Sequence, residues 1–423
     1  MITAIEARRY RCLRYVRQDL GAFHVLVGPN ASGKSTFLDV IGFLGALVSD
    51  GLDAAVRERT QNIEDLMWGR KGDGFELAVE ARIPPERLSL IAEGKTTEVE
   101  TIRYEVSIGI DRTTGEYEIS HERALLKPAA EPAAAARNGV FPFAREEPPT
   151  IMSKRAVRKE RTVLTKKKGG NANFYSEATE ESGKGWFPSI KLGPRKSALG
   201  NLPEDEVKFP VSTWLKTFLS QGVQPLVLNS LLIRRASPPG QGKVFRADGS
   251  NLPWVVHDLQ KRAPERVKDW IEHVKTALPD LAGVRVIERE DDKHRYLVLQ
   301  YEGGLEVPSW MASDGTLRLL ALTLPAYLPE LGGVFLIEEP ENGIHPKAVE
   351  TVFQSLSSTY GAQVLLATHS PVILSVVEPN HVLCFAKTGD GASDIVSGDE
   401  HPALRDWRGE TNLGVLFAGG VLG

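Results

Sequence analysis

Nine consecutive residues near the N-terminus have the types and spacing of a phosphate-binding loop. Gly28-Pro29-Asn30-Ala31-Ser32-Gly33-Lys34-Ser35-Thr36 fits G-x-x-x-x-G-K-[ST], between an apolar run and a helix-like stretch. Its backbone N–H groups would surround a β-phosphate, aided by the N-terminus of the following helix. We expect Lys34 to reach the β- and γ-phosphates and Ser35 to offer its hydroxyl to Mg²⁺. A glycine-rich turn with an incidental lysine would not explain the full spacing, so the pattern predicts binding of ATP with Mg²⁺.

Two adjacent carboxylates end an apolar run in the C-terminal part of the chain. Val334–Ile337 is followed directly by Glu338 and Glu339. A buried strand would deliver both carboxylates beside the phosphates, at the carboxyl edge of a sheet. We expect Glu338 to hold the Mg²⁺ shell and Glu339 to orient and deprotonate the attacking water. An acidic pair at a strand end usually faces solvent, and only the phosphate loop favours the catalytic interpretation.

A histidine ends the next apolar run. Val364–Ala367 is followed by Thr368-His369, where His369 could contact a γ-phosphate and sense its loss. A single histidine at a strand end is more often structural. Its position one β-α unit after the carboxylates favours the sensor interpretation.

A second candidate anion site precedes the helix-like stretch Leu317–Leu328. In Ser313-Asp314-Gly315-Thr316, a hydroxyl, a glycine N–H and a helix N-terminus could together hold an anion. Taken alone, this tetrapeptide is an ordinary helix N-cap.

The elements that must position these groups follow two patterns. The ends of the chain alternate between short apolar runs and helix-like stretches, as in an α/β core assembled from both termini. The middle has period-two runs, typical of antiparallel strands, and further helix-like stretches. The strands expected in the middle are Phe75–Ala81, Ile102–Ile110, Glu116–Ile119, Val284–Glu290 and Arg295–Tyr301. The helices expected in the middle include Thr213–Ser220 and Val255–Leu278, and those expected at the ends include Ser35–Val48 and Ala348–Tyr360.

These patterns divide the chain into four parts. Residues 1–127 would form the N-terminal part of the nucleotide core with an antiparallel β lobe, and 128–193 a basic, partly flexible insertion. Residues 194–304 would form a helical lobe with a hairpin, and 305–423 the C-terminal part of the core. The apolar, glycine-containing tail 413–423 could dock on its own core or on a partner protein.

The insertion carries a block of eight basic residues within Lys154–Lys168: Lys154, Arg155, Arg158, Lys159, Arg161, Lys166, Lys167 and Lys168. A mobile, solvated charge run is one interpretation. Non-specific contact with a nucleic-acid backbone is the other. No interleaved aromatic residues support sequence-specific recognition.

Composition limits the location and the partners of the protein. The chain has 423 residues and a formal net charge of −4, from 51 basic and 55 acidic residues, so any nucleic-acid contact must be local. Its two cysteines, Cys12 and Cys384, lie far apart, as suits a reducing cytoplasm. We expect no signal peptide, and the apolar runs are too short to cross a membrane, which takes about 20 residues. A cytoplasmic protein without a membrane partner is predicted.

In this order, the motifs resemble those of ABC ATPases of the SMC/RecF/OLD class. The resemblance covers about 50 N-terminal residues and the last ~120. Gly28–Thr36 resembles the Walker A motif, Ala312–Thr316 the signature, Val334–Glu339 the Walker B motif, Glu341–His345 the D-loop and Thr368-His369 the switch histidine. The resemblance implies an α/β P-loop NTPase of the ABC type, with a RecA-like core, an antiparallel β lobe and a helical lobe containing an insertion. It also implies a homodimer in which Ser313, Asp314 and Gly315 of one copy complete the ATP site of the other.

The sequence departs from the class pattern at several positions. Glu338 stands where many ABC proteins have Asp, Asp314 replaces a signature glycine, and Ala312 replaces the usual leucine. Gln61 is a Q-loop candidate by position only. The sequences of these motifs are similar to those of stand-alone OLD-like ATPases of bacterial phage-defence modules. The residues after Val382–Phe385 are too few for a Toprim nuclease domain, so we expect a separately encoded effector such as a nuclease.

Three alternatives remain open at the level of function. A RecF-like ATPase of DNA repair or recombination would share the same motifs. A second alternative is an energising subunit of a membrane transporter, but the central basic segment and the Glu-Glu-Pro pattern are less typical of such subunits. A scaffold could bind ATP and turn it over negligibly.

Overall fold

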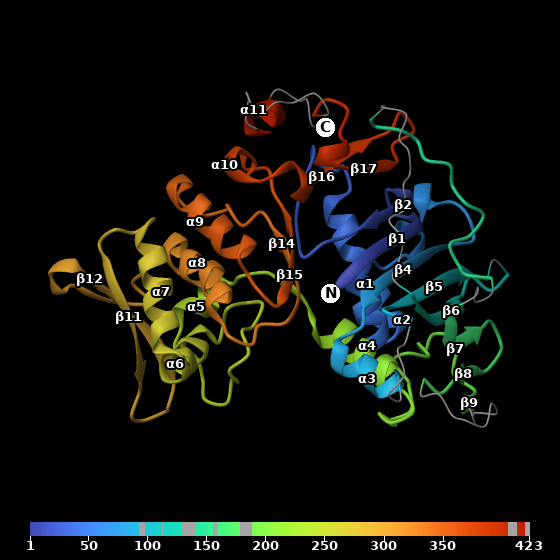
Figure 1. Cartoon of the computed structure of the whole chain (residues 1–423), viewed down its shortest axis with the longest axis horizontal. Coiled ribbons are helices and arrows are strands. Elements are labelled where there is room, and N and C mark those ends of the chain that lie inside the picture. Colours follow the sequence, from blue (N-terminus) through green and yellow to red (C-terminus); the bar gives the residue numbers. More distant parts are fainter. Residues whose placement is uncertain are drawn as a thin grey trace.

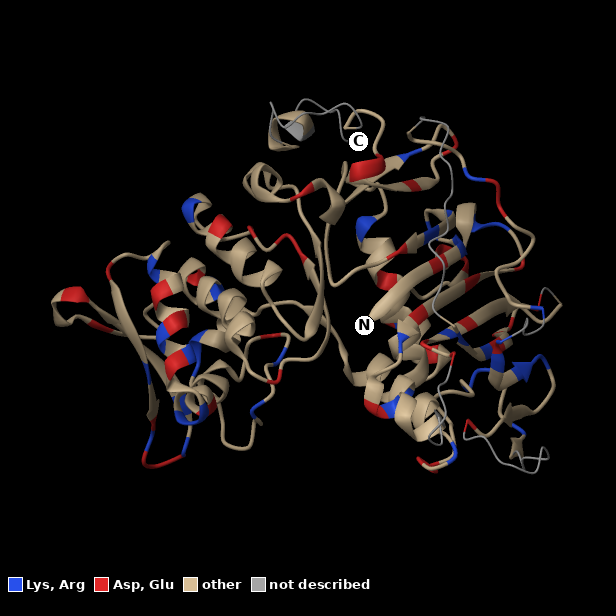
Figure 2. Cartoon of the chain, viewed as in Figure 1, with Lys and Arg blue, Asp and Glu red and all other residues tan. Residues whose placement is uncertain are grey.

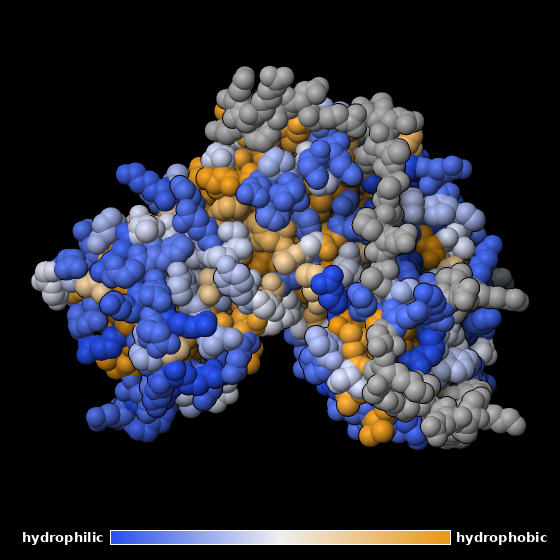
Figure 3. All heavy atoms as spheres, in the orientation of Figure 1, coloured by the Kyte–Doolittle hydropathy of each residue, from blue (hydrophilic) through white to orange (hydrophobic). Residues whose placement is uncertain are grey.

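The computed structural model describes residues 1–92, 98–111, 113–128, 141–154, 159–177, 188–404 and 413–418. Within these residues the strands form three sheets, and the chain folds into two lobes on either side of the central sheet (Figure 1). We call the half built on the eight-stranded sheet and α1–α4 the β lobe, and the half built on α5–α10 and the three-stranded sheet the helical lobe. Figure 3 shows the surface hollowed between the two lobes, with apolar surface on both sides of the hollow.

The central six-stranded sheet joins the two ends of the chain. Its strands, in pairing order, are β10 (Val223–Leu226), β14 (Gly333–Glu338), β15 (Ala362–Ala367), β3 (Phe23–Val27), β16 (Val382–Lys387) and β17 (Ser393–Ser397). All neighbours pair in parallel except β17, which is antiparallel to β16. The N-terminal strand β3 thus lies between two strands from the C-terminal part. Because parallel strands place their carboxyl ends at one edge, the segments after β3, β14 and β15 meet there.

Side chains of the central sheet alternate between two hydrophobic cores. Along β14, Val334 and Leu336 enter the core shared with the β lobe, whereas Phe335 and Ile337 enter the core shared with the helical lobe. Because successive side chains of a strand point to opposite faces, a strand covered on both sides must be apolar throughout. This explains why β3, β14 and β15 are apolar apart from His24, Gln363 and the terminal Glu338.

The eight-stranded sheet is antiparallel and forms the outer layer of the β lobe. Its strands, in pairing order, are β2 (Leu13–Asp19), β1 (Ile2–Tyr10), β4 (Gly74–Arg82), β5 (Thr101–Ile110), β6 (Tyr117–Lys127), β7 (Arg161–Lys167), β8 (Ala172–Phe174) and β9 (Ser189–Ile190). Its helices are α1 (Lys34–Ser49), α2 (Leu52–Arg57), α3 (Pro85–Ala92) and α4 (Pro210–Gln221). Helix α1 is apolar on most of its surface because it contributes to the core shared by the two sheets and also packs on α4.

The helical lobe contains the three-stranded sheet β11 (Leu281–Glu288), β12 (Arg295–Tyr301) and β13 (Glu306–Pro308). Its helices are α5 (Ser230–Arg234), α6 (Leu252–Arg262), α7 (Pro264–Lys275), α8 (Asp314–Thr323), α9 (Pro346–Ser357) and α10 (Pro371–Val376). The single helix expected over Val255–Leu278 is instead two, because Pro264 cannot continue α6 and begins α7. Helix α8 ends at Thr323, and Pro325 lies in the 3₁₀ turn that follows it.

The range 128–193, expected as a partly flexible insertion, joins the β lobe wherever it is described. Strands β7, β8 and β9 extend the eight-stranded sheet. The preceding segment, 141–154, is held against the sheet by carboxylates: Glu76 accepts hydrogen bonds from Thr150 Oγ1 and Ile151 N at 2.8 Å, and Glu105 accepts one from Ser153 N at 2.8 Å. Over these residues, the segment is therefore part of the β lobe and does not form a unit of its own.

The basic block is correspondingly not one solvated run. Lys166 lies in β7 and is buried, and its ammonium group donates to the carbonyl oxygens of Gly193 and Lys196. Burial lowers the pKa of Lys166, although Glu122 and Glu118 oppose this effect. Lys154, Lys159, Lys167 and Lys168 are exposed, whereas Arg155 and Arg158 lie outside the described residues. Lys and Arg along β7 are mixed with acidic residues on neighbouring strands (Figure 2).

The structure also moves one boundary of the sequence-based division and places part of the C-terminal tail. Helix α4, within the expected helical lobe 194–304, packs on α1 and shares the core of the β lobe. The chain enters the helical lobe only after β10. At the other end, α11 (Leu413–Ala418) packs on α10 with Leu413 buried, so this part of the tail docks on its own chain. Residues 419–423 of the predicted tail lie outside the described residues.

Candidate functional site

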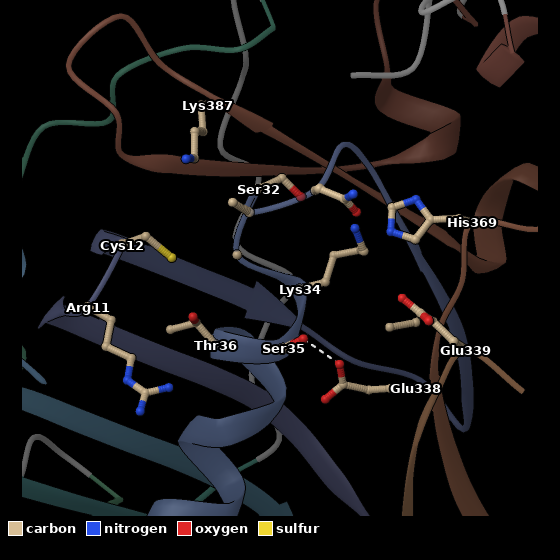
Figure 4. Close-up of a pocket in the computed structure, with 14 residues that line it drawn as sticks. Arg11, Cys12, Ser32, Lys34, Ser35, Thr36, Glu338, Glu339, His369 and Lys387 are labelled. Atoms are coloured by element: carbon tan, nitrogen blue, oxygen red, sulfur yellow. Dashed lines mark hydrogen bonds between the residues drawn. The ribbon is translucent and has the colours of Figure 1, made fainter. Parts of the chain in front are cut away.

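A cavity of about 390 Å³ lies at the carboxyl edge of the central sheet, around the loop that follows β3 (Figure 4). Glu338, Glu339 and His369 lie on one side of Lys34, and Arg11, Cys12 and Lys387 on the other. Most of the residues predicted for nucleotide binding therefore gather in one place. The lining residues are Arg11, Cys12, Asn30, Ala31, Ser32, Gly33, Lys34, Ser35, Thr36, Glu338, Glu339, Ala367, His369 and Lys387.

The two glycines of the loop are required by close packing and by backbone conformation. Gly28 has φ 147°, and a Cβ there would lie 2.2 Å from the carbonyl oxygen of Phe385 in β16. Gly33 has φ 108°, and a Cβ there would lie 2.3 Å from Ser393 Oγ in β17. A side chain would therefore be strained at both positions. The hairpin β16–β17 holds the loop from one side, and the carbonyl of Ser32 accepts a hydrogen bond from Ser393 Oγ at 2.6 Å.

Lys34 is buried at the first position of α1, and its side chain lies over the loop. Its Nζ donates to the carbonyl oxygens of Gly28 at 2.7 Å and Pro29 at 3.1 Å. Burial lowers the pKa of Lys34, while Glu339 and Glu338 oppose this effect by stabilising the ammonium form. The ammonium group thus lies between the loop and the two carboxylates, where it can bind phosphate oxygens.

Ser35 and Glu338 are brought together from opposite ends of the chain. Ser35 Oγ donates a hydrogen bond to Glu338 Oε2, although 303 positions separate the two residues. A hydroxyl and a carboxylate are hard oxygen donors of the kind that Mg²⁺ prefers. Within the described ranges, no group of three or more His, Cys, Asp or Glu could hold a metal. This pair therefore fits Mg²⁺ bound mainly by phosphate and water oxygens, as is usual for that ion.

Glu339 follows β14 in an uncommon backbone conformation. Its φ is 47°, in the left-handed region that residues other than glycine seldom adopt. Its N–H donates to the carbonyl of Ala367 at 2.8 Å, and its carboxylate accepts a hydrogen bond from Asn342 Nδ2. The carboxylate is exposed to the cavity. Local backbone strain of this kind is common at functional sites.

His369 enters the cavity from the segment after β15. Thr368 N donates to the carbonyl of Leu26 at 3.1 Å, which ties this segment to the end of β3. The imidazole lies on the same side of Lys34 as Glu339 (Figure 4). A side chain there can contact the terminal phosphate of a nucleotide held by the loop.

The signature residues lie in the helical lobe and do not line the cavity. Ser313 caps α8 by accepting a hydrogen bond from Thr316 N at 3.1 Å. Asp314 Oδ1 accepts from Arg234 Nη2 at 2.6 Å and Nε at 2.9 Å. A Cβ on Gly315 would lie 2.8 Å from the carbonyl oxygen of Gly343, so the start of α8 packs on the loop after β14. Ser313 and Asp314 are exposed.

Three lining residues were missed by the sequence motifs: Arg11, Cys12 and Lys387. The first two lie in the turn between β1 and β2, where Arg11 has φ 49°, and Lys387 ends β16. Arg11 is one of several arginines in that hairpin, and no spacing distinguishes it from the others. Gln61, the positional Q-loop candidate, does not line the cavity.

The comparisons with known proteins agree with this geometry. Residues 23–375 match the family described as "AAA domain, putative AbiEii toxin, Type IV TA system". Among solved structures, an SmcHead bound to the C-winged helix domain of ScpA is similar with a TM-score of 0.51 and 13% identity, over 94% of this chain and 97% of that chain. An SMC head domain from Thermotoga maritima matches with a TM-score of 0.41 and 11% identity, over 94% and 98%. The first likeness shows the fold of an SMC head, which confirms the predicted P-loop core of ABC type.

No helix in the part of the chain that the structure describes is long and apolar enough to span a membrane.

Proposed function

Because this chain belongs to the AAA-domain family of the AbiEii type and is an ATP-binding, ATP-hydrolysing enzyme, we propose that it hydrolyses ATP between two copies of itself. The observation that carries the proposal is the separation of two half-sites. The phosphate loop, Glu339 and His369 line one cavity, whereas Ser313 and Gly315 lie in the other lobe. A second copy can bring its signature to the ATP that the first copy holds.

Within one copy, each residue has a separate part in the reaction. Residues 28–36 hold the phosphates through backbone N–H groups, and Lys34 neutralises charge on the β- and γ-phosphates. Ser35 and Glu338 would hold Mg²⁺, which supplies charge neutralisation on the phosphate oxygens when bound.

Glu339 acts as the base for the attacking water, and His369 contacts the γ-phosphate. The Glu339 carboxylate accepts a hydrogen bond from Asn342, which leaves its other oxygen to orient water and take its proton. Release of the γ-phosphate takes away a ligand of His369 and of the partner's signature, so the pair of copies separates.

We further propose that the pair senses or clamps DNA in the cytoplasm and controls a separately encoded effector, such as a nuclease, in defence against phage. The OLD-like motifs and the AbiEii-type family support this role. Exposed lysines support a DNA contact, but Lys159 and Lys168 are paired with Glu98 and Glu118. A RecF-like role in repair remains the main rival, and a transporter subunit is a lesser one.

The catalytic proposal is tested by Glu339→Gln, which keeps the size of the side chain and removes the base. We expect kcat to fall by about 10²- to 10⁴-fold, the usual contribution of a general base, with ATP affinity preserved. The variant should form a dimer in ATP and return to a monomer in ADP, as measured by light scattering. Glu350→Gln on the exposed surface of α9 is the matched control. Equal ATPase rates for wild type and Glu339→Gln would overturn the assignment, and equally negligible rates would favour a scaffold.

The DNA proposal is tested by reversing the exposed charges of Lys154 and Lys167 together, leaving the buried Lys166 and the paired Lys159 and Lys168 in place. We expect weaker binding to duplex DNA of random sequence. The dependence of log K on log salt should also become shallower, by about one unit for each phosphate that the protein no longer neutralises. An unchanged salt slope would remove this surface as the DNA contact.

A further inference from the structure

The loop that connects β14 to α9, residues 339–345, contacts both the end of β15 and the start of α8. It begins with the proposed base Glu339 and contains Glu341, a half-buried carboxylate that takes no part in the chemistry proposed above. The D-loop resemblance of this segment does not explain what the Glu341 side chain does within its own chain.

Glu341 holds the backbone on which His369 is placed. Its Oε1 accepts a hydrogen bond from Thr368 Oγ1 at 2.6 Å and another from His369 N at 3.0 Å. Thr368 is fully buried, and its hydroxyl also accepts a hydrogen bond from Ser370 N at 2.9 Å. One carboxylate oxygen therefore holds Thr368 and His369 directly, and Ser370 through the Thr368 hydroxyl. Hydrogen bonds to a charged acceptor are stronger than neutral ones, so this arrangement is stiff.

The two oxygens of Glu341 differ in their contacts. Glu341 Oε2 is buried and has no hydrogen-bond partner among the residues that the structure describes. The bonds of Glu341 to the segment after β15 are therefore made by Oε1. The cap of α10 does not require Glu341, because Ser370 Oγ already accepts a hydrogen bond from Ile373 N.

The same loop also orients Glu339. Asn342 donates through Nδ2 to the Glu339 carboxylate and through its backbone N–H to the Glu339 carbonyl at 3.0 Å. Glu339 N in turn donates to Ala367, the residue just before Thr368. The base and the proposed sensor therefore lie on two segments that are bonded to each other, at Glu339–Ala367 and at Glu341–Thr368.

We propose that Glu341 is a positioning residue that fixes His369 against the γ-phosphate and keeps it in register with Glu339. The inference rests on the proposed function, since it assumes that His369 contacts the nucleotide. Glu341 itself touches neither substrate nor the reacting atoms in this arrangement. Because its hydrogen bonds are to Thr368 and His369, we expect its effect on turnover to pass through His369.

The test is a double-mutant cycle on ATPase rates, with Glu341→Ala, His369→Ala and the combination of both. Glu341→Ala should lower kcat by roughly 10- to 100-fold, as expected when a supporting residue lets a reacting group shift by about 1 Å. The dissociation constant of ATP should change by less than about threefold, because Lys34 and the loop are untouched. In the His369→Ala background, adding Glu341→Ala should lower kcat by less than about threefold further.

Conservative variants separate positioning from folding. Glu341→Gln keeps an oxygen that can accept both hydrogen bonds, so its kcat should stay within about fivefold of wild type. Thr368→Val removes one donor and should lower kcat in the same direction as Glu341→Ala. Melting temperatures of all variants, measured with and without ATP, identify any variant that is unfolded.

The outcomes that would overturn the inference differ from those that would overturn the proposed function. A full 10- to 100-fold decrease on adding Glu341→Ala to His369→Ala would show that Glu341 does not act through the histidine. An unchanged kcat in folded Glu341→Ala, or a fall in ATP affinity as large as the fall in kcat, would also overturn it. By contrast, unchanged kcat in His369→Ala or Glu339→Gln would overturn the assigned roles of those residues in the proposed function.

Discussion

The nucleotide cavity and the signature differ in how their residues are supported. In the cavity, the loop after β3 and the start of α1 meet the ends of β14 and β15, as in the hydrogen bond between Ser35 and Glu338. At the signature, Ser313 caps the first turn of α8, and Asp314 pairs with Arg234 of the adjacent α5. Met311 and Leu231 beside it are 70% and 67% exposed. The cavity is therefore assembled within one chain, whereas the signature faces outward.

Under the proposed function, this difference means that one copy holds the groups for the reaction and is an incomplete enzyme without a second copy. A parallel sheet places three strand ends within reach of one phosphate loop, which needs no second chain. The signature is a helix start on the other lobe, and the exposed hydroxyl of Ser313 bonds to Thr316 of its own helix. Variants that damage the cavity and the signature separately can therefore test whether the two act together.

The largest effect is expected from variants that disable the two halves in different copies. Lys34→Ala should abolish phosphate binding in the cavity, and Ser313→Arg should block the signature face, each lowering ATPase activity by about 100-fold or more. A mixed pair keeps one intact cavity facing one intact signature. Equimolar mixing should therefore restore up to roughly a quarter of wild-type activity, since half of the pairs are mixed and each has one working site.

The steady-state ATPase rate of the mixture, compared with that of each variant at the same total concentration, measures this rescue. A mixture no more active than its components would contradict the shared site and would place both halves of the reaction within one chain.

A smaller effect is expected from changing the backbone of the cavity alone. Gly28→Ala places a Cβ against the Phe385 carbonyl at a φ that alanine rarely adopts. We expect a decrease of about 1–3 kcal/mol in the free energy of unfolding, together with weaker ATP binding. Urea unfolding and ATP titration measure the two effects. Gly389→Ala, where a Cβ would have open space, is the matched control and should be close to neutral. Equal stability of both variants would show that the loop can relax away from β16.

A third effect, on stability alone, concerns pH and should be confined to the β lobe. Glu177 is fully buried, and its carboxylate accepts hydrogen bonds at the N-terminus of α4, including one from Ser212 N at 2.9 Å. Burial raises the pKa of Glu177 to about 7, although the hydrogen bonds from Ser212 and Val211 oppose this effect. Between the unfolded value near 4.5 and about 7, the folded state therefore binds more protons than the unfolded state.

Stability should accordingly fall as pH rises from about 5 to about 8, by on the order of 1–3 kcal/mol. Glu177→Gln, which stays neutral, should remove this part of the pH dependence. Hydrogen exchange at the two ends of this pH range can assign the change to α4 and α1 and leave α8 as the internal control. A pH dependence that is the same in the variant would assign the effect to other groups.

Local spacing predicted the parts of the site that depend on neighbours in the chain. The loop of residues 28–36, the run that ends in Glu338-Glu339 and the strand before His369 are each readable because one strand and one turn suffice to define them. The helix over Val255–Leu278 was less predictable, because its apolar period continues through Pro264 and only the proline marks the break. The likeness to an SMC head confirms the fold that these motifs implied.

Other features depended on contacts that no local pattern contains. Lys166 looked like part of a solvated basic run, but as a member of β7 its side chain points inward to backbone carbonyls. Arg11, Cys12 and Lys387 reach the cavity because the β1–β2 turn and β16 pass beside the loop. Glu341 is one acidic residue among several in its segment until Thr368 and His369 are brought to it.

Spacing along a single strand and turn was enough to predict a phosphate loop, a pair of catalytic-type carboxylates and a strand-end histidine. Spacing could not predict which of these groups share a cavity, that the signature lies apart from them, or which carboxylate bonds to the backbone of the histidine. Those outcomes follow from strand order and lobe packing, which bring residues such as Ser35 and Glu338 together across 303 positions of the chain.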